Sequence, residues 1–322
     1  MGGDGETLVR IASAGVGHGG YLQIAVWLGN RLTEVVDDLT YWVDYHTTAK
    51  WFRKGLELLR RGEAELALLN TRGLGAMAMR GRGLFGEPFP GLRALATFPH
   101  HDWLLFAVDQ SFGVRTFAEL KERKPPLRLT TGFLDGDNVV GLFALELLKR
   151  HGIEPAELEA WGGALLPTGI WETKELIESG EANAICQEGV FSEDFRSLMR
   201  RRPMYGLPTE PRVLEELREA WGWESLTVPA NFYVGQTEPL VAPDFSAWLL
   251  CAREDLDERL AHTIAGLVVD HGSELNRNTL AGGRGISLSS PQPPVVAKEA
   301  VDTSPVPLHP GAERLYRERG LL

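Results

Sequence analysis

Short apolar runs alternate with amphipathic segments along most of the chain. Residues 8–12 form an apolar run, and residues 21–32 then repeat apolar side chains at the spacing of a helix. The same pattern predicts strands at 40–45, 65–70, 92–98, 103–108, 127–131, 158–161, 182–186 and 245–252, and helices at 51–61, 139–151, 172–179 and 255–271. Strands that alternate with helices are typical of an α/β protein.

Two parts of the chain share one order of features. LRRGEAELALLN (59–70) and IESGEANAICQE (177–188) each follow a glycine-containing loop and a helix, and each reads Gly-Glu-Ala, strand, polar end. This internal symmetry predicts two similar α/β lobes. Residues 228–241 are then expected to return the chain from the second lobe. The proline-rich segment 289–310 predicts an extended surface strap, and HPGAERLYRERGLL (309–322) a short closing helix.

Composition narrows the class of partner. The 322 residues suffice for two domains, and 43% apolar with 24% charged residues is typical of a globular protein. The net charge of −11 argues against nucleic acid or an anionic membrane as the main partner. No run approaches the ~20 apolar residues of a membrane span, so membrane insertion is not expected. Arg200-Arg201-Arg202 is expected to be a solvated helix end, and Cys186 and Cys251 to be buried, unpaired thiols.

The beginning of the sequence, MGGDGETLVRIASAG, bears on the compartment. It has no basic segment, apolar segment or cleavage site typical of a secretory signal. The expectation is therefore a cytoplasmic protein if the sequence is the whole gene product. A periplasmic or extracytoplasmic protein is expected if a leader was removed.

Six segments, in order, carry a resemblance to a known family: LRRGEAELALLN, LRALATF, GVRTFAELKERKPPLRLTTG, LIESGEANAIC, VPANFYVGQTEPLVAPDFSAWLLCAREDLDERL and PLHPGAERLYRERG. Together they resemble the TAXI family of solute receptors, which serve tripartite (TRAP) transporters. The resemblance implies a type II periplasmic-binding-protein fold, α/β and two-lobed, with a ligand cleft at the hinge. Lobe one would comprise 1–108 and 243–322, and lobe two 109–242. Membrane permease subunits of a TRAP-type transporter would be partners.

In such a fold the ligand meets strand carboxyl ends and helix N-termini, where unpaired N–H groups favour an anion. The glycine-rich loop 15–21 is expected to bind ligand, with a tight strand-to-helix turn as the alternative. The family places a threonine and a tyrosine here; this chain has Gly17 beside His18 but keeps Tyr21. Asn70 and Thr71 fall at a cleft position of the family, or cap a turn. Thr48 either caps a helix or donates to the ligand.

The loop GFLDGDN (132–138) departs from the family, whose Gly/Ser/Thr-rich turn grips a carboxylate. Asp137 is expected to cap the following helix and so to satisfy its N–H donors. The departure favours a zwitterion, a polar neutral molecule or an aromatic acid over a plain dicarboxylate. His100, His101 and Asp102 are expected to form a cleft wall or structural hydrogen bonds. No metal is predicted, because no third ligand can be named.

Strand ends and one aromatic residue complete the predicted site. Gln187 and Glu188 end a strand of lobe two, and Phe232 would supply an apolar wall, with core packing as its alternative. The predicted ligand-binding residues are Ser13, Gly17, His18, Gly19, Tyr21, Thr48, Asn70, Thr71, His100, His101, Asp102, Gly132, Asp135, Asp137, Asn138, Gln187, Glu188 and Phe232.

Three functions fit these residues. The first is a receptor that captures a small polar or carboxylate-bearing molecule by lobe closure; no nucleophile motif or cofactor motif is recognised, so no catalytic residue and no cofactor are predicted. The second is a cytoplasmic enzyme on the same fold, such as a decarboxylase or other lyase of an aromatic or organic acid. For it, His18, His100, His101, Asp135 and Asp137 could serve as acid or base. The third is a cytoplasmic ligand sensor.

Overall fold

The computed structural model describes residues 7–14, 19–46, 51–99, 101–189, 193–275 and 297–322. The chain divides into two compact units. Unit 1 comprises Met1–His101 and Ser246–Leu322, and unit 2 comprises Asp102–Phe245.

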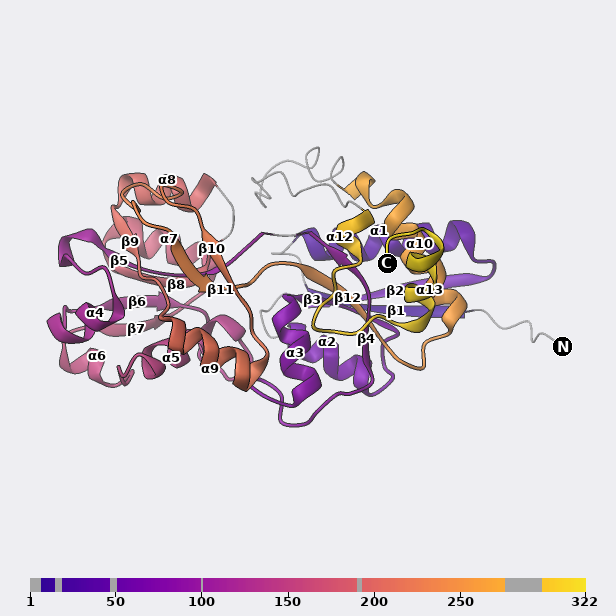
Figure 1. The fold of residues 1–322 in the computed structure, drawn as a ribbon, viewed down its shortest axis with the longest axis horizontal. Helices are drawn as coiled ribbons and strands as arrows, with labels where there is room; N and C mark the ends of the chain where they lie inside the picture. Colours follow the sequence, from indigo (N-terminus) through magenta and orange to yellow (C-terminus); the bar gives the residue numbers. More distant parts are fainter. Residues whose placement is uncertain (1–6, 15–18, 47–50, 100, 190–192, 276–296) are drawn as a thin grey trace. The chain divides into compact units, whose positions relative to one another are not determined.

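Unit 1 is built on a five-stranded sheet with the order β2-β1-β3-β12-β4 (Figure 1). β1 runs parallel to β2 and β3, whereas β12 is antiparallel to β3 and β4. The elements of unit 1 are β1 (Thr7–Ala14), α1 (Gly19–Val35), β2 (Leu39–His46), α2 (Trp51–Arg60), β3 (Leu66–Asn70), α3 (Arg72–Arg80), β4 (Leu92–Phe98), β12 (Trp248–Arg253), α10 (Glu258–His271), α12 (Ala297–Ala300) and α13 (Pro310–Glu318).

Helices α1 and α2 cover opposite faces of this sheet. Tyr41, the register partner of Val9, packs against Gly29 of α1, and a Cβ at Gly29 would lie 2.3 Å from the Tyr41 ring. Ala12 lies against Gly55 of α2. Val9 and Ala12 point to opposite faces because side chains alternate along a strand. Glycine at position 29 therefore allows α1 to approach β2 closely.

The carboxyl-terminal segment extends the sheet of unit 1. The Ala94 N–H donates to the carbonyl oxygen of Pro307 (2.9 Å), and the His309 N–H donates to that of Ala94 (2.9 Å). This chain segment therefore runs along the outer edge of β4. Of the predicted strap, 297–310 is held on unit 1 in this way, and 289–296 lies outside the described residues.

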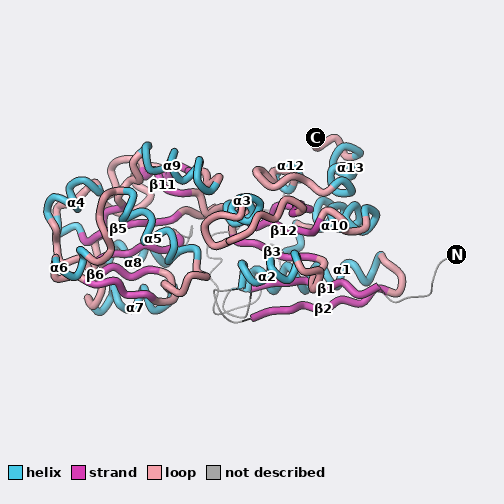
Figure 2. The backbone as a smooth tube through the Cα atoms, turned by 90° about the horizontal axis from the view of Figure 1, so that it is seen from below, coloured by secondary structure: helices cyan, strands magenta, loops and turns pink. Residues whose placement is uncertain are grey.

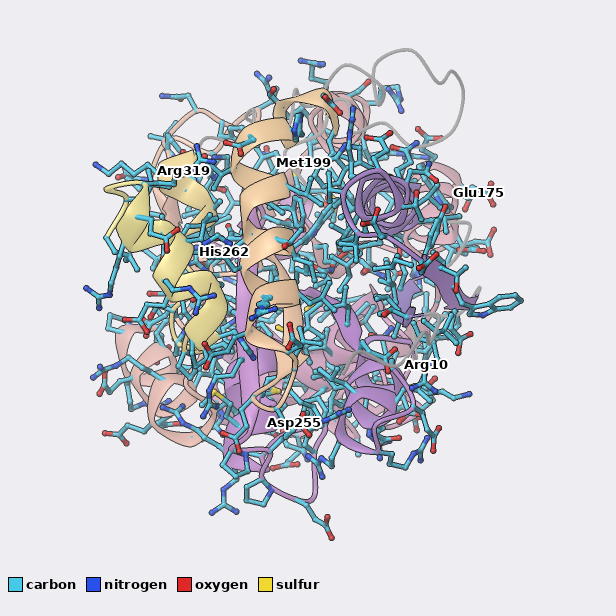
Figure 3. All side chains as sticks on the ribbon, turned by 90° about the vertical axis from the view of Figure 1, so that its right-hand side faces the viewer. Arg10, Glu175, Met199, Asp255, His262 and Arg319 are labelled. Atoms are coloured by element: carbon cyan, nitrogen blue, oxygen red, sulfur yellow. The ribbon has the colours of Figure 1, made fainter. Side chains whose placement is uncertain are left out.

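The last helix, α13, packs beside α10 (Figure 3). His262 Nε2 lies 2.8 Å from Glu318 Oε2, and Arg319 Nη2 lies 2.8 Å from Asp270 Oδ2. Tyr316, fully buried, donates its hydroxyl to the carbonyl oxygen of Leu95 (2.6 Å). The predicted closing helix is thus confirmed, and it is part of unit 1.

Unit 2 repeats the same sheet (Figure 2), with the order β7-β6-β8-β5-β9. β6 is parallel to β7 and β8, and β5 is antiparallel to β8 and β9. The elements are β5 (Leu104–Asp109), η1 (Gln110–Phe112), α4 (Phe117–Arg123), β6 (Arg128–Thr131), α5 (Val139–Arg150), α6 (Glu157–Ala160), β7 (Ala164–Pro167), α7 (Ile170–Ser179), β8 (Ala184–Glu188), α8 (Glu193–Arg201), β9 (Met204–Gly206), α9 (Pro211–Trp221) and the separate antiparallel pair β10 (Ser225–Val228) and β11 (Leu240–Pro243).

The two sheets correspond strand for strand. β6, β7 and β8 take the places of β1, β2 and β3, and β5 and β9 those of β12 and β4. The two Gly-Glu-Ala segments precede β3 and β8, which are equivalent strands. The prediction of an α/β fold with two similar lobes is therefore confirmed.

Some predicted elements differ from the observed ones. The strand predicted at 158–161 is wrong: Leu158 is buried in helix α6, and the strand follows at β7. Gly162, at φ +79°, ends the helix. Helix α3 is not predicted, because its middle residues 73–78 are all buried and the two glycines and two alanines among them leave no clear apolar period.

The units divide at 101/102 and 245/246, whereas the sequence places the lobe boundaries at 108/109 and 242/243. At the first boundary the difference arises because β5 pairs with β8 of unit 2 from its first residue, Leu104, and with β9 from Ala107. Among the described helices, none combines the length and the apolar character needed to cross a bilayer.

Candidate functional site

The carboxyl edge of the unit 1 sheet carries buried polar side chains. Ser13 in β1 and Asn70 at the end of β3 are both buried, and Thr71 follows directly. The Thr71 Oγ1 accepts the N–H of Gly73 (3.0 Å) and caps α3. Thr71 is therefore the N-cap of α3. β1 and β3 are adjacent parallel strands, so their ends meet at one edge of the sheet.

An aromatic pair lies at the same edge. The Tyr21 ring of α1 is 4.2 Å from the Trp248 ring, centroid to centroid. Trp248 begins β12 and is the register partner of Asn70. Trp248 is not among the predicted site residues. Its place opposite Asn70 depends on the pairing of strands that are far apart in sequence. The one sequence signal that could have pointed to Trp248 is its position in the strand that returns to lobe one.

In unit 2 the equivalent edge is formed by β6 and β8. Thr131 and Cys186 are register partners, and the chain continues from them into Gly132 and Gln187. Asn138 caps α5, because its Oδ1 accepts the N–H of Gly141 (2.9 Å). A Cβ at Gly132 would lie 2.3 Å from this Oδ1. Glycine at position 132 therefore leaves room for the cap, and the fold brings Gly132, Asn138 and Gln187 to one edge.

The prediction that Asp137 caps the helix is wrong. Asp135 Oδ1 accepts the backbone N–H groups of Asp137 (3.0 Å) and Asn138 (3.1 Å), which closes the loop into a turn. The helix therefore begins one residue later than Asp137 would require, and Asn138 becomes the cap. These two N–H groups are occupied by a carboxylate of the chain itself, which leaves fewer donors for an anionic ligand.

Gln187 is held by a buried polar network. Its Nε2 donates to Thr173 Oγ1 (3.2 Å) in α7, and this hydroxyl lies 2.8 Å from the Thr130 hydroxyl. The network fixes the amide group of Gln187 at the end of β8. Glu188, the last residue of β8, is half-buried and is the register partner of Leu104.

Asp102 and Phe232 have structural contacts. Asp102 is fully buried; its Oδ1 accepts the N–H of Trp103 (2.7 Å), and its carbonyl oxygen accepts that of Phe245 (3.1 Å). The Phe232 ring packs edge-on against that of Trp103, with centroids 5.1 Å apart. Burial, followed by the charge of Asp102, raises the pKa of the Tyr233 hydroxyl well above its usual value.

Several predicted residues are placed only in part. Gly17, His18, Thr48 and His100 lie outside the described residues. Gly19 is the first residue of α1, and His101 is exposed.

Among the described residues, no three His, Cys, Asp or Glu side chains are grouped so that they could hold a metal ion. Burial raises the pKa of both Cys186 and Cys251, so the two thiols are protonated and unpaired at neutral pH.

Comparison with known proteins gives the family of the chain. The profile of the NMT1-like family matches residues 12–320. The chain belongs to the NMT1-like family. No curated protein matches its sequence.

Solved structures similar to this NMT1-like protein include three ligand-binding proteins. MatC from Rhodopseudomonas palustris with bound malate is 11% identical, with 98% of each chain covered and a TM-score of 0.49. The aliphatic sulphonate binding protein SsuA from Escherichia coli is 12% identical, with 98% and 94% covered and a TM-score of 0.46. PhnD1 from Prochlorococcus marinus in complex with methylphosphonate is 13% identical, with 99% and 100% covered and a TM-score of 0.45.

The chain has an α/β fold of two units, each built on a five-stranded sheet of the same strand arrangement, as the sequence predicts.

Proposed function

We propose that this NMT1-like protein is a solute-binding protein that captures a small polar or carboxylate-bearing organic molecule by closing its two units on it. The observation that carries the proposal is the equivalence of the two carboxyl edges. Near the carboxyl ends of its first and third parallel strands each unit carries buried polar residues, Ser13 with Asn70 and Thr131 with Gln187, and each unit has a capped helix N-terminus at this edge. Ligands of open α/β sheets bind at such edges.

The chemistry of these groups suits capture better than turnover. Amide, hydroxyl and backbone N–H groups bind a ligand by hydrogen bonds, and a hydroxyl acts as a nucleophile only where an adjacent general base activates it. Asp135 is engaged by two backbone N–H groups, and both thiols are protonated. The predicted site residues remain our proposal for the residues that contact the ligand.

Within the NMT1-like family, we place the chain in the TAXI subfamily on the six ordered segments quoted above. The partners would then be the membrane permease subunits of a TRAP-type transporter, and the protein would work outside the cytoplasm. Genes for large membrane permeases beside its own gene would support this placement. A catabolic operon without them would favour the cytoplasmic enzyme.

The test is to identify the molecule that copurifies with the protein. Native mass spectrometry of the purified protein should show a bound species. The ligand can then be removed by partial unfolding and refolding. Small-angle X-ray scattering should give a smaller radius of gyration for the ligand-bound protein than for the ligand-free protein. The ligand should be recovered intact after prolonged incubation. Steady formation of product, lost in Asp135→Ala or His18→Ala, would replace this proposal with the enzyme.

A further inference from the structure

A cavity lies in unit 2, at the opposite edge of the sheet from Gly132 and Gln187. Its volume is about 260 Å³, the liquid volume of about nine water molecules, and below the 300–1,000 Å³ of drug-sized ligand pockets. It is therefore of a size for a small metabolite. Its lining residues are Asp109, Ser111, Phe112, Arg128, Ile177, Gly180, Ala182, Asn183, Arg202 and Met204.

Three of the polar residues stand in a row across the sheet. The Asp109 N–H donates to the carbonyl oxygen of Asn183 (2.8 Å), and the Asn183 N–H donates to that of Arg128 (3.1 Å). Asp109 ends β5, Asn183 directly precedes β8 and Arg128 begins β6; the three strands are adjacent, and neighbouring strands are about 4.8 Å apart. The backbone positions of Asp109 and Arg128 are therefore about 10 Å apart, with a cation on one side of the cavity and a carboxylate on the other.

The two arginines are held in place by the carboxyl end of α7. Arg128 donates from Nε to the carbonyl oxygen of Glu181 (2.7 Å) and from Nη2 to that of Gly180 (2.8 Å). Arg202 donates from Nε to the carbonyl oxygen of Glu178 (3.2 Å). A guanidinium has five N–H donors, so each arginine keeps donors beyond these bonds. The cations are thus pre-positioned by backbone carbonyls.

The lining of the cavity is mainly polar, with a smaller apolar part. The apolar part comes from Ile177 in α7, Ala182 before β8 and Met204 in β9, each at most 3% exposed. Asp109 Oδ1 accepts the N–H of Ser111 (2.8 Å), which fixes the carboxylate. Two cations, one anion and a small apolar part complement a ligand with a carboxylate, an ammonium group and a short hydrocarbon part. A plain dianion would be repelled by Asp109, and a plain amine by the two arginines.

We propose that this cavity binds a small zwitterionic amino acid, with its carboxylate at Arg128 and Arg202 and its ammonium group at Asp109. The site is independent of the proposed solute site, because it lies at the amino ends of β6 and β8 and the solute residues lie at their carboxyl ends.

The test uses leucine and 5-aminopentanoate as probes. The analogues that lack one charge are 4-methylpentanoate and 3-methylbutylamine for leucine, and pentanoate and butylamine for 5-aminopentanoate. Amide chemical shifts of Ser111, Gly180 and Asn183 report on the cavity in the unmodified full chain. At least one zwitterion should shift these signals saturably, and should bind about tenfold or more tightly than its single-charge analogue, because a hydrogen bond to a charged group is lost in the analogue.

Variants separate binding from structure. Asp109→Asn should abolish the preference for the zwitterion over the carboxylic acid, and Arg128→Ala should weaken zwitterion binding about tenfold or more. Arg93→Ala is the matched control, since Arg93 also donates to backbone carbonyls, those of Pro90 (2.7 Å) and Leu92 (2.9 Å), but lies in unit 1. Asn138→Ala should leave these shifts unchanged, which distinguishes the cavity from the solute site.

The proposal is overturned if neither zwitterion shifts the cavity signals of the wild-type protein at millimolar concentration. It is equally overturned if the single-charge acid binds as tightly as the zwitterion, or if Arg93→Ala weakens binding as much as Arg128→Ala does. None of these outcomes bears on whether a solute copurifies at the other edge.

Discussion

The ring of Tyr21 lies 4.2 Å from the ring of Trp248, with the two planes tilted by 41°. Trp248 in turn is the register partner of Asn70. Helix α1 and strand β12, from opposite ends of the chain, therefore meet at the end of β3, where buried polar groups gather. This contact ties the proposed solute edge of unit 1 to its core.

Loss of the Trp248 ring should destabilise unit 1. Both rings are at most 6% exposed, so Trp248→Ala should lower the free energy of unfolding by about 3–5 kcal/mol. Trp248→Phe keeps an aromatic ring against Tyr21 and should lower the free energy of unfolding by clearly less than Trp248→Ala does. Urea unfolding followed by circular dichroism measures both. Equal losses in the two variants would show that the ring contact does not matter.

Asn138 is expected to serve both the helix and the ligand. Asn138→Ala removes the cap of α5 and should cost about 1 kcal/mol of stability. Thr116→Ala is the matched control, because the Thr116 Oγ1 caps α4 by accepting the Glu119 N–H (3.1 Å) in the same unit. Both variants should lose similar stability in urea unfolding.

Only Asn138→Ala should lower the fraction of ligand-bound protein in native mass spectrometry, by about fivefold or more. Asn138→Asp, which can still cap, should recover the stability. A control variant that loses as much bound ligand as Asn138→Ala would remove Asn138 from the proposed site.

His151 should make stability depend on pH. The centroid of its ring lies 3.8 Å from that of the stacked Phe117 ring. Nδ1 lies 2.7 Å from the carbonyl oxygen of Leu147. Nε2 accepts the backbone N–H of Glu210 (3.3 Å). Burial lowers the pKa of His151 in the folded state, and the charge of Arg212 lowers it further. The carbonyl group of Leu147 and the charges of Glu210 and Glu216 raise this pKa, but by less than burial lowers it. The folded protein therefore keeps this imidazole neutral.

The unfolded chain binds a proton at His151 below its ordinary pKa of about 6.5, while the folded protein does not. The free energy of unfolding should therefore be fully present above about pH 6.5 and should fall as the pH drops from there toward the lowered folded pKa. His151→Gln should flatten this slope. Chemical denaturation across this pH range measures the free energy of unfolding at each pH. An unchanged slope in His151→Gln would contradict the assignment of the pH dependence to His151.

Neither thiol should react in the folded protein. Cys186 and Cys251 are fully buried, and burial raises the pKa of both. A thiol reagent such as Ellman's should label both only after unfolding in guanidinium chloride, because the thiolate is the reactive form. Rapid labelling of Cys186 under native conditions would mean that the carboxyl edge of β8 opens to solvent, and would reopen the question of a thiol chemistry there.

Local pattern was enough to predict the α/β class and its internal repeat. Neighbouring residues alone show the alternation of apolar runs with segments that repeat apolar side chains at helical spacing. The Gly-Glu-Ala segments precede the equivalent strands β3 and β8. The sequence also predicts that Asn70, Gly132 and Gln187 stand at strand ends, since a strand end follows from where an apolar run stops. Capping chemistry was predicted for the 132–138 loop, but one residue too early, because the hydrogen bonds of Asp135 decide where α5 begins.

Only the tertiary structure decided which distant residues meet. Trp248 stands opposite Asn70, and Asp109, Asn183 and Arg128 line one cavity, because of strand pairings that no local signal encodes. Register between strands far apart in sequence is set by the packing of the whole sheet and its helices. The sequence therefore determines most of the elements and where their apolar runs stop, and the fold determines which of those ends form a site.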